Sequence, residues 1–234
     1  IELINTASSD LDVVFFGDSI IEHFMETQFG INKNRNEPIQ KVFRDTFITS
    51  NTTTKSTNNN KKYRALASGI SGDTTSQLLY RLQNGELPNS FNPSVFWILV
   101  GANDLNKQNN NKQQQCTVVS DILNNSIRII EYILKQKKSF KKIVINSLLP
   151  TMVLSKKVSE TPIIHLSNKV NQRLACYVAS LEDPRIEFFN ATDLFVRDDT
   201  VVGMREFVHP NAEGSKVWLD AIVHRLDQIL GSSD

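Results

Sequence analysis

Short apolar runs recur along the chain. Each run is four to six residues long, too short for a typical helix, and we expect each to form a buried β-strand. The run VFWILV at residues 95–100 is continuously apolar, which is typical of a central parallel strand covered on both faces. The five expected strands are residues 11–16, 63–68, 95–100, 142–147 and 186–189.

Stretches with apolar residues at helical spacing separate these runs. In residues 74–82, for example, Leu78, Leu79 and Leu82 lie on one face of a helix. The expected helices are residues 20–29, 74–82, 116–135, 166–181 and 211–230, the last of which ends at Gly231.

The alternation of strands and helices predicts an α/β fold. We expect a three-layer αβα sandwich around a five-stranded parallel sheet. Ligands of such sheets bind outside the carboxyl ends of the strands. The chemistry of this chain is therefore expected just after residues 16, 68, 100 and 147.

Two polar tracts interrupt this order, at about residues 49–62 and 107–115. They are rich in Asn, Thr and Gln and nearly free of apolar residues, so they cannot contribute to a core. Each is either a lid over a site or a tolerated insertion in a surface loop. The chain of 234 residues is otherwise expected to form a single domain, 1–234, that carries these two insertions.

Composition and charge narrow the function classes. The formal net charge is +1, which provides no electrostatic footprint for nucleic acid or for an anionic membrane. No apolar run approaches the roughly 18 residues that a transmembrane segment needs. The two cysteines, Cys116 and Cys176, exclude a disulfide framework, and we expect them to be buried thiols in helices.

The first expected strand ends in the sequence Gly17-Asp18-Ser19. A serine on a sharp turn between a strand and a helix presents its hydroxyl at the carboxyl edge of the sheet. The free backbone amides and the positive dipole end of the following helix lie at the same place. Alternatively, Asp18 or Ser19 is simply the cap of that helix.

The next two strand ends carry candidate hydrogen-bond donors. Gly72, after the second strand, allows a backbone amide to approach a ligand closely. Asn103, after the third, offers an uncharged side-chain N–H donor, which suits an oxyanion hole. The alternative for both loops is a glycine-containing turn with a local side-chain cap.

A histidine precedes the last expected helix. His209 stands in a loop, three residues after Glu206. A serine hydroxyl needs a neighbouring imidazole to remove its proton, and the imidazole needs an acceptor that fixes its tautomer. His209 and Glu206 are candidates for these two roles. The other histidines fall within or near helices, and we expect them to be structural or solvated: His23, His165 and His224.

Four blocks in this order resemble those of the SGNH/GDSL hydrolases, whose fold is flavodoxin-like. They are Gly17-Asp18-Ser19, Gly72, Gly101-Ala102-Asn103-Asp104 and the acid-x-x-His that ends at His209. The resemblance spans residues 13–214. Residues 69–75, 80–87 and 148–150 are most similar to the catalytic subunits of intracellular platelet-activating-factor acetylhydrolases (type Ib).

The resemblance implies a role for each block. Ser19 would be the nucleophile, His209 the base and Glu206 the acid of a catalytic triad. The amides of Ser19 and Gly72 and the side chain of Asn103 would form the oxyanion hole. The residues beside the catalytic ones would shape a small acyl pocket: Ile20, Ala102 and Val208.

The implied activity is that of a serine esterase for short-acyl esters, above all acetyl esters, that works through an acyl-enzyme without metal or organic cofactor. The alternatives are a carbohydrate acetylesterase on the same fold and a catalytically inactive relative that acts as a binding partner. The resemblance also implies a homodimer and favours a cytoplasmic location, while the missing start of the chain leaves the secretory pathway open.

Two features depart from the family pattern. Glu206 stands where the family usually has Asp, and the loop between the first two blocks is longer because of the 49–62 tract. If Glu206 does not reach His209, a backbone carbonyl or a more distant carboxylate such as Asp199 remains to orient the imidazole.

Overall fold

A computed structural model describes residues 11–25, 27–29, 31–32, 37–49, 63–106, 112–150, 157–205 and 208–231. Most of the two polar tracts, residues 50–62 and 107–111, lies outside the described residues, as does Glu206. The expectation that these tracts form lids or surface loops therefore stays a prediction, as does the single domain over 1–234.

The centre of the fold is the expected five-stranded parallel sheet. Its strands lie in the order β4-β1-β5-β6-β7, and every neighbouring pair is parallel. The α/β fold class is confirmed, and each expected strand is present within two residues of its predicted ends. The strands are β1 (Val13–Gly17), β4 (Ala65–Gly69), β5 (Val95–Leu99), β6 (Lys142–Asn146) and β7 (Ile186–Phe189).

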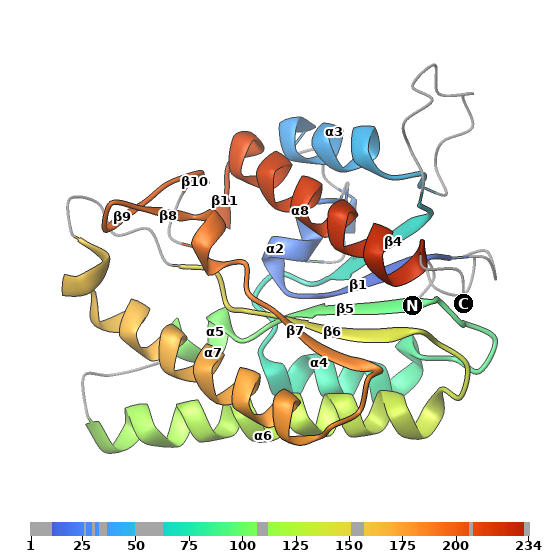
Figure 1. The fold of residues 1–234 in the computed structure, drawn as a ribbon, viewed down its shortest axis with the longest axis horizontal. Coiled ribbons are helices and arrows are strands. Elements are labelled where there is room, and N and C mark those ends of the chain that lie inside the picture. Colours follow the sequence, from blue (N-terminus) through green and yellow to red (C-terminus); the bar gives the residue numbers. More distant parts are fainter. Residues whose placement is uncertain are drawn as a thin grey trace.

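Helices cover both faces of this sheet (Figure 1). On one face lie α2 (Ser19–Glu22), α3 (Glu37–Thr46) and α8 (Ala212–Leu230). On the other lie α4 (Thr75–Arg81), α6 (Lys112–Gln136) and α7 (Pro162–Ser180). The short α5 (Ala102–Asn106) follows β5, and two-residue strands β8 to β11 precede α8: Val196–Arg197, Thr200–Val201, Met204–Arg205 and His209–Pro210.

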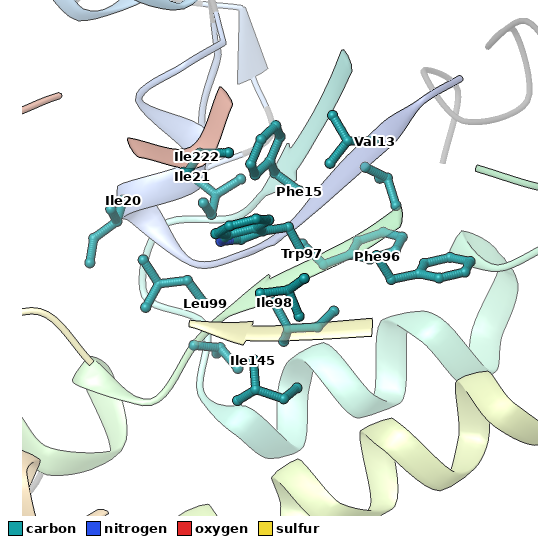
Figure 2. Packing of buried hydrophobic residues seen from close by; sticks show 14 of the residues in the cluster. Val13, Phe15, Ile20, Ile21, Phe96, Trp97, Ile98, Leu99, Ile145 and Ile222 are labelled. Atoms are coloured by element: carbon teal, nitrogen blue, oxygen red, sulfur yellow. The ribbon is translucent and has the colours of Figure 1, made fainter. Parts of the chain in front are cut away.

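The core is built on the two central strands. Trp97 of β5 is fully buried, and Phe15 of the adjacent β1 packs against its ring (Figure 2). The indole N–H groups of Trp97 and of Trp218 in α8 both donate to the Asn146 side-chain oxygen, at 3.0 and 3.1 Å. Both tryptophans are thus buried without an unsatisfied donor, which would otherwise cost about 1–3 kcal/mol each.

The expected helix at residues 20–29 is wrong in its length. The α-helix ends at Glu22, and the amides of Phe24 and Met25 donate to carbonyl oxygens three residues earlier, which forms a turn in place of a further helical turn. Beyond it, β2 (Thr27–Gln28) and β3 (Ile31–Asn32) pair antiparallel. Ile20, Ile21 and Phe24 are buried, whereas Phe29 is 63% exposed, so the apolar spacing marks a buried face only in the first part of this segment.

Helix α3 was not predicted. It packs on α8 and buries Ile39 and Phe43, which are four residues apart. That spacing is typical of a helix, but a segment of ten mostly polar residues gives only a weak pattern. The apolar face of α3 is covered by α8, which follows far along the chain, so the local sequence did not indicate its partner.

Two further predictions need correction. Helix α6 begins at Lys112, inside the tract that we assigned to 107–115, because Gln and Lys are good helix formers. Both cysteines are free and exposed rather than buried. Cys176 stands two residues from the buried Leu174 and Val178 and therefore on the opposite face of α7, and Cys116 lies three residues before Val119, the first buried residue among the described side chains of α6.

Within the described part of the chain, no helix is both long and apolar enough to cross a bilayer.

Candidate active site

The turn after β1 presents Ser19 at the carboxyl edge of the sheet. A side chain at Gly17 would meet the Leu99 carbonyl oxygen at 2.2 Å, so only glycine lets β1 pass β5 this closely. The Asp18 carboxylate caps α2 by accepting a hydrogen bond from the Ile20 amide at 3.0 Å. Ser19 is therefore the first residue of α2, and Asp18, rather than Ser19, is the helix cap.

The fold brings His209 to Ser19 from 190 residues away along the chain. The Ser19 Oγ and the His209 Nε2 lie 2.8 Å apart, in hydrogen-bond contact. His209 belongs to β11, which pairs antiparallel with β10, and Asn211 close to it caps α8 by accepting from the Gly214 amide at 2.8 Å. The last helix is thus anchored directly beside His209.

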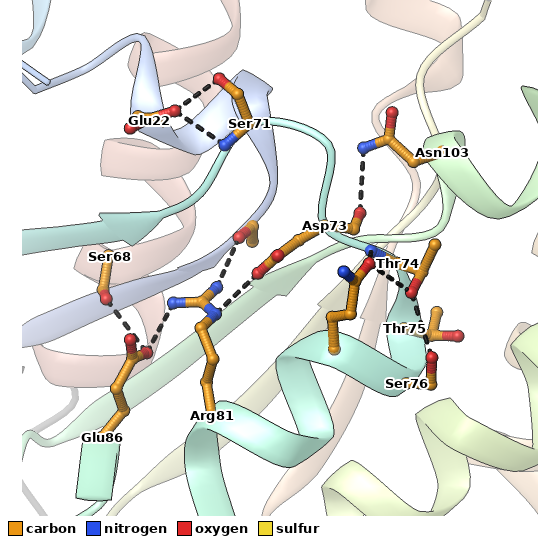
Figure 3. Close-up of polar contacts among 12 residues, drawn as sticks. Glu22, Ser68, Ser71, Asp73, Thr74, Thr75, Ser76, Arg81, Glu86 and Asn103 are labelled. Carbon is orange, nitrogen blue, oxygen red and sulfur yellow. Dashed lines mark hydrogen bonds and ion pairs between the residues drawn. The ribbon is translucent and has the colours of Figure 1, made fainter. Parts of the chain in front are cut away.

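The expected oxyanion residues lie at the same edge. Gly72 adopts a φ of 88°, a conformation that favours glycine, and no atom lies within 4 Å of where its Cβ would be. The Asn103 side-chain amide donates to the Asp73 carbonyl oxygen at 2.9 Å (Figure 3). An amide group has two N–H donors, so this bond fixes the Asn103 side chain and leaves its second N–H for a ligand.

Arg81 of α4 ties the strand ends together. Its guanidinium donates to the Gly17 carbonyl oxygen at 2.9 Å and forms ion pairs with Asp73 and Glu86, both at 2.6 Å (Figure 3). Glu86 in turn accepts from Ser68, the penultimate residue of β4, at 3.3 Å. This half-buried cation therefore holds the turn before Ser19 and the loop that contains Gly72 in one fixed arrangement.

Two further carboxylates fasten the loop from residue 70 to residue 75. The Glu22 side chain is fully buried and accepts from the backbone amide and the hydroxyl of Ser71. Asp104, next to Asn103, accepts from the amide and the hydroxyl of Thr75 at 2.9 and 2.8 Å. The three loops at the sheet edge are thus linked by charge-assisted hydrogen bonds, which are the stronger kind.

The three expected acyl-pocket residues lie next to the site residues in sequence. Ile20 and Val208 are buried, and Ala102 is half-buried and packs against the core. Their assignment to an acyl pocket stays a prediction.

The position of the acid relative to His209 is not described, because Glu206 is outside the described residues. The alternative carboxylate, Asp199, is engaged elsewhere. It accepts from the Ser159 amide at 3.0 Å and the Ser159 hydroxyl at 2.6 Å, and these bonds lower the pKa of the Asp199 carboxyl. Asp199 is therefore not a suitable partner for the imidazole.

His23 is a neighbour of the site that we expected to be structural or solvated. Its ring lies 4.5 Å from the His209 ring, measured between centroids. Burial lowers the pKa of His23 to about 3, and the charges of His209 and Arg205 act in the same direction. The signal in the sequence was its spacing of four residues from Ser19, which places both on one side of a helical turn.

Asp18 is a buried carboxyl group directly before Ser19. The pKa of Asp18 is raised to about 7, chiefly by burial and also by the charges of Asp73 and Asp104, against the opposing hydrogen bond from Ile20. Its Oδ2 has no hydrogen-bond partner among the described residues. The group is therefore protonated in the folded protein over a pH range in which it is ionised in the unfolded chain.

This shift predicts a pH-dependent stability that Asp18→Asn removes. Because the folded-state pKa is the higher one, the contribution of Asp18 to stability is greatest below pH 4 and declines until about pH 7. Three pKa units correspond to about 4 kcal/mol. The substituted amide keeps an oxygen that can cap α2, so urea unfolding should show the variant gaining up to this amount relative to the parent between pH 4 and pH 8. If the difference in unfolding free energy between the variant and the parent were the same at pH 4 and at pH 8, the raised pKa of Asp18 would be contradicted.

Among the described residues, no group of three or more His, Cys, Asp or Glu side chains could hold a metal ion.

This arrangement of a parallel sheet with serine, glycine, asparagine and histidine at its carboxyl edge defines a class of esterases and acylhydrolases. The chain matches the GDSL-like Lipase/Acylhydrolase family over residues 15–217, and it belongs to that family.

The individual proteins that the chain resembles have low sequence identity to it. The chain is 25% identical to the human platelet-activating factor acetylhydrolase IB subunit alpha2 over 206 residues, which cover 87% of this chain and 70% of that protein. The fold is similar to a GDSL-like lipase from Bacteroides thetaiotaomicron (TM-score 0.61, 19% identity, 92% of this chain and 87% of the other). It is also similar to a catalytic mutant of the acetylxylan esterase Axe2 from Geobacillus stearothermophilus (TM-score 0.61, 15% identity, 92% and 94%).

Proposed function

We propose that this chain is a serine carboxylic-ester hydrolase that prefers short acyl groups, acetyl above all, and works through an acyl-enzyme. The observation that carries the proposal is the 2.8 Å contact between the Ser19 Oγ and the His209 Nε2 at the carboxyl edge of the sheet. A nucleophile and a base within hydrogen-bond reach are the signature of this chemistry.

In the first half of the reaction, Ser19 attacks the ester carbonyl carbon while the His209 Nε2 takes the hydroxyl proton. The carbonyl oxygen gains negative charge and is stabilised by the amides of Ser19 and Gly72 and by the second N–H of Asn103. Because Arg81, Glu22 and Asp104 already hold these loops, the donors need little reorganisation as the charge develops.

The tetrahedral intermediate collapses when His209 returns the proton to the leaving alcohol, and the acyl group remains on Ser19. A water molecule then gives a proton to His209 and attacks the acyl carbon. When the second intermediate collapses, the bond between the acyl carbon and the Ser19 Oγ breaks, His209 returns the proton to that oxygen, and the acid is released. Glu206 is proposed to accept from the His209 Nδ1 during both steps. Every step uses groups of the chain and water.

The acyl preference rests on Ile20, Ala102 and Val208, which narrow the space beside the nucleophile, the oxyanion donor and the base. Ile20 and Val208 are buried next to Ser19 and His209 in the sequence, and this supports the proposal that their side chains limit the length of the acyl chain. We expect p-nitrophenyl acetate and butyrate to be hydrolysed far faster than the octanoate, measured as kcat/KM along a series of acyl lengths. A profile that peaks at eight carbons or more would contradict the proposed pocket.

A carbohydrate acetylesterase is the second candidate, because the solved structures of similar fold include an acetylxylan esterase. The two candidates share the acyl group and differ in the alcohol. Release of acetate from acetylated xylan and from a short-chain acetyl glycerolipid, measured side by side, separates them.

A further inference from the structure

Two side chains join the segment of the nucleophile to the segment of the base, in addition to the contact of Ser19 with His209. His23 caps the C-terminal end of α2, and its backbone amide donates to the Ser19 carbonyl oxygen at 3.0 Å, so it stands one turn after Ser19. Its half-buried ring lies against the His209 ring with a centroid distance of 4.5 Å and an interplanar angle of 47°.

Arg205 holds this second imidazole from the side of the base. Arg205 is the residue directly across from His209 in the pairing of β10 with β11. Its Nη2 lies 3.2 Å from the His23 Nδ1. A guanidinium group only donates hydrogen bonds, so the His23 Nδ1 is the acceptor and the proton of the neutral ring is on its Nε2.

We propose that His23 is a positioning residue for the catalytic base: its ring packs against the His209 ring and keeps the His209 Nε2 directed at the Ser19 Oγ. The inference rests on the proposed function. The bond to Ser19 engages the Nε2 edge of the His209 ring, and the His23 ring packs against the same imidazole from a second direction. Displacement of a catalytic group by about 1 Å can cost 10²-fold in rate, so this second contact is expected to matter.

The neutral state of His23 is part of this role. When Ser19 attacks, His209 becomes an imidazolium ion, and a charged neighbour at 4.5 Å would oppose that step. Burial and the nearby Arg205 keep His23 uncharged, so its ring contacts His209 without electrostatic repulsion.

The test compares His23→Ala with His23→Phe. Alanine removes the ring, while phenylalanine keeps a planar ring without the nitrogen that Arg205 binds. For His23→Ala we expect kcat for p-nitrophenyl acetate and the rate of labelling by a fluorophosphonate probe to fall by about 10 to 100-fold, with KM within about threefold of the parent. For His23→Phe we expect kcat to recover to within about fivefold of the parent.

The matched control is His224→Ala, which removes an exposed imidazole of α8 and should leave all these values unchanged. Thermal unfolding of each variant shows whether it is folded, and His23→Leu replaces His23→Ala if the latter precipitates. The inference is overturned if kcat of the ring-less variant stays within twofold of the parent. It is equally overturned if His23→Phe is as slow as the ring-less variant.

Failure of the proposed function has a different signature. A folded parent protein that neither hydrolyses short esters nor reacts with the probe would contradict the esterase itself. An active parent beside an equally active His23→Ala would contradict only the role of His23.

Discussion

Ser19→Ala should give a folded protein whose kcat for p-nitrophenyl acetate is lower by roughly 10⁴ to 10⁶-fold, as is usual when the nucleophile of a serine hydrolase is removed. The loss is large because the acyl-enzyme can no longer form and water must attack directly. The loss of stability should be small, because the Ser19 hydroxyl contacts His209 rather than the apolar core.

The control for this experiment is a fluorophosphonate probe, which should label the parent at Ser19 and leave Ser19→Ala unlabelled. A variant that retains most of the esterase activity would show that another group is the nucleophile. A folded parent that is never labelled would favour the alternative of an inactive relative that acts as a binding partner. Some residual rate is compatible with the proposal, since the oxyanion donors and substrate binding remain.

Glu206→Gln should lower kcat by several orders of magnitude, up to about 10⁴-fold. Glu206 is three residues before His209 and is the expected acceptor of its Nδ1–H. A glutamine has nearly the same shape but cannot stabilise the imidazolium ion that forms when Ser19 is attacking, and its amide can select the wrong tautomer. The pH dependence of kcat/KM should also change, because the carboxylate raises the basicity of the imidazole.

Glu206→Asp is the matched variant. It keeps the charge and restores the shorter acid that the family usually has, so it should retain substantial activity or exceed the parent. Near-parent activity of Glu206→Gln would show that Glu206 is not the acid of a triad. A backbone carbonyl that orients His209 in a Ser–His pair would then be the better explanation, because the Asp199 carboxylate is already held by Ser159.

The buried polar network around Arg81 explains why the candidate site can be rigid although it is assembled from loops. Each of the loops after β1, β4 and β5 is held by a buried or half-buried ionic side chain: by Arg81, Glu22 or Asp104. Removal of one partner from such a network leaves the other charge unpaired, which is strongly destabilising. Charged residues that do not touch a substrate are therefore part of the structural basis of the proposed oxyanion hole.

The sequence by itself determined the sheet and the location of the chemistry. A parallel strand that is covered on both faces must be apolar throughout, so the runs that became β1 and β5 were visible without a structure. The short segments that follow the strands contain Ser19, Gly72 and Asn103 in the order of the family blocks. Chain order and strand direction are sufficient to place these residues at one edge.

Only the tertiary structure decided which side chains meet there. The contact between Ser19 and His209 joins residues 190 positions apart, and local sequence patterns carry no information about such distances. The Asn103 side chain is held by the carbonyl oxygen of Asp73, and the Asp73 carboxylate pairs with Arg81, a surface-type residue that becomes half-buried only through the packing of α4.

His23 shows the same limit most clearly. A histidine four residues after a serine on a short helix is consistent with a structural or solvated side chain, and the local pattern predicts nothing more. It lies in the site because the pairing of β10 with β11 brings His209 and Arg205 to it from the other end of the chain. The local sequence was sufficient to predict the helical turn that contains His23. Its neighbours His209 and Arg205 come from a distant part of the chain and reach it only when the whole chain has folded.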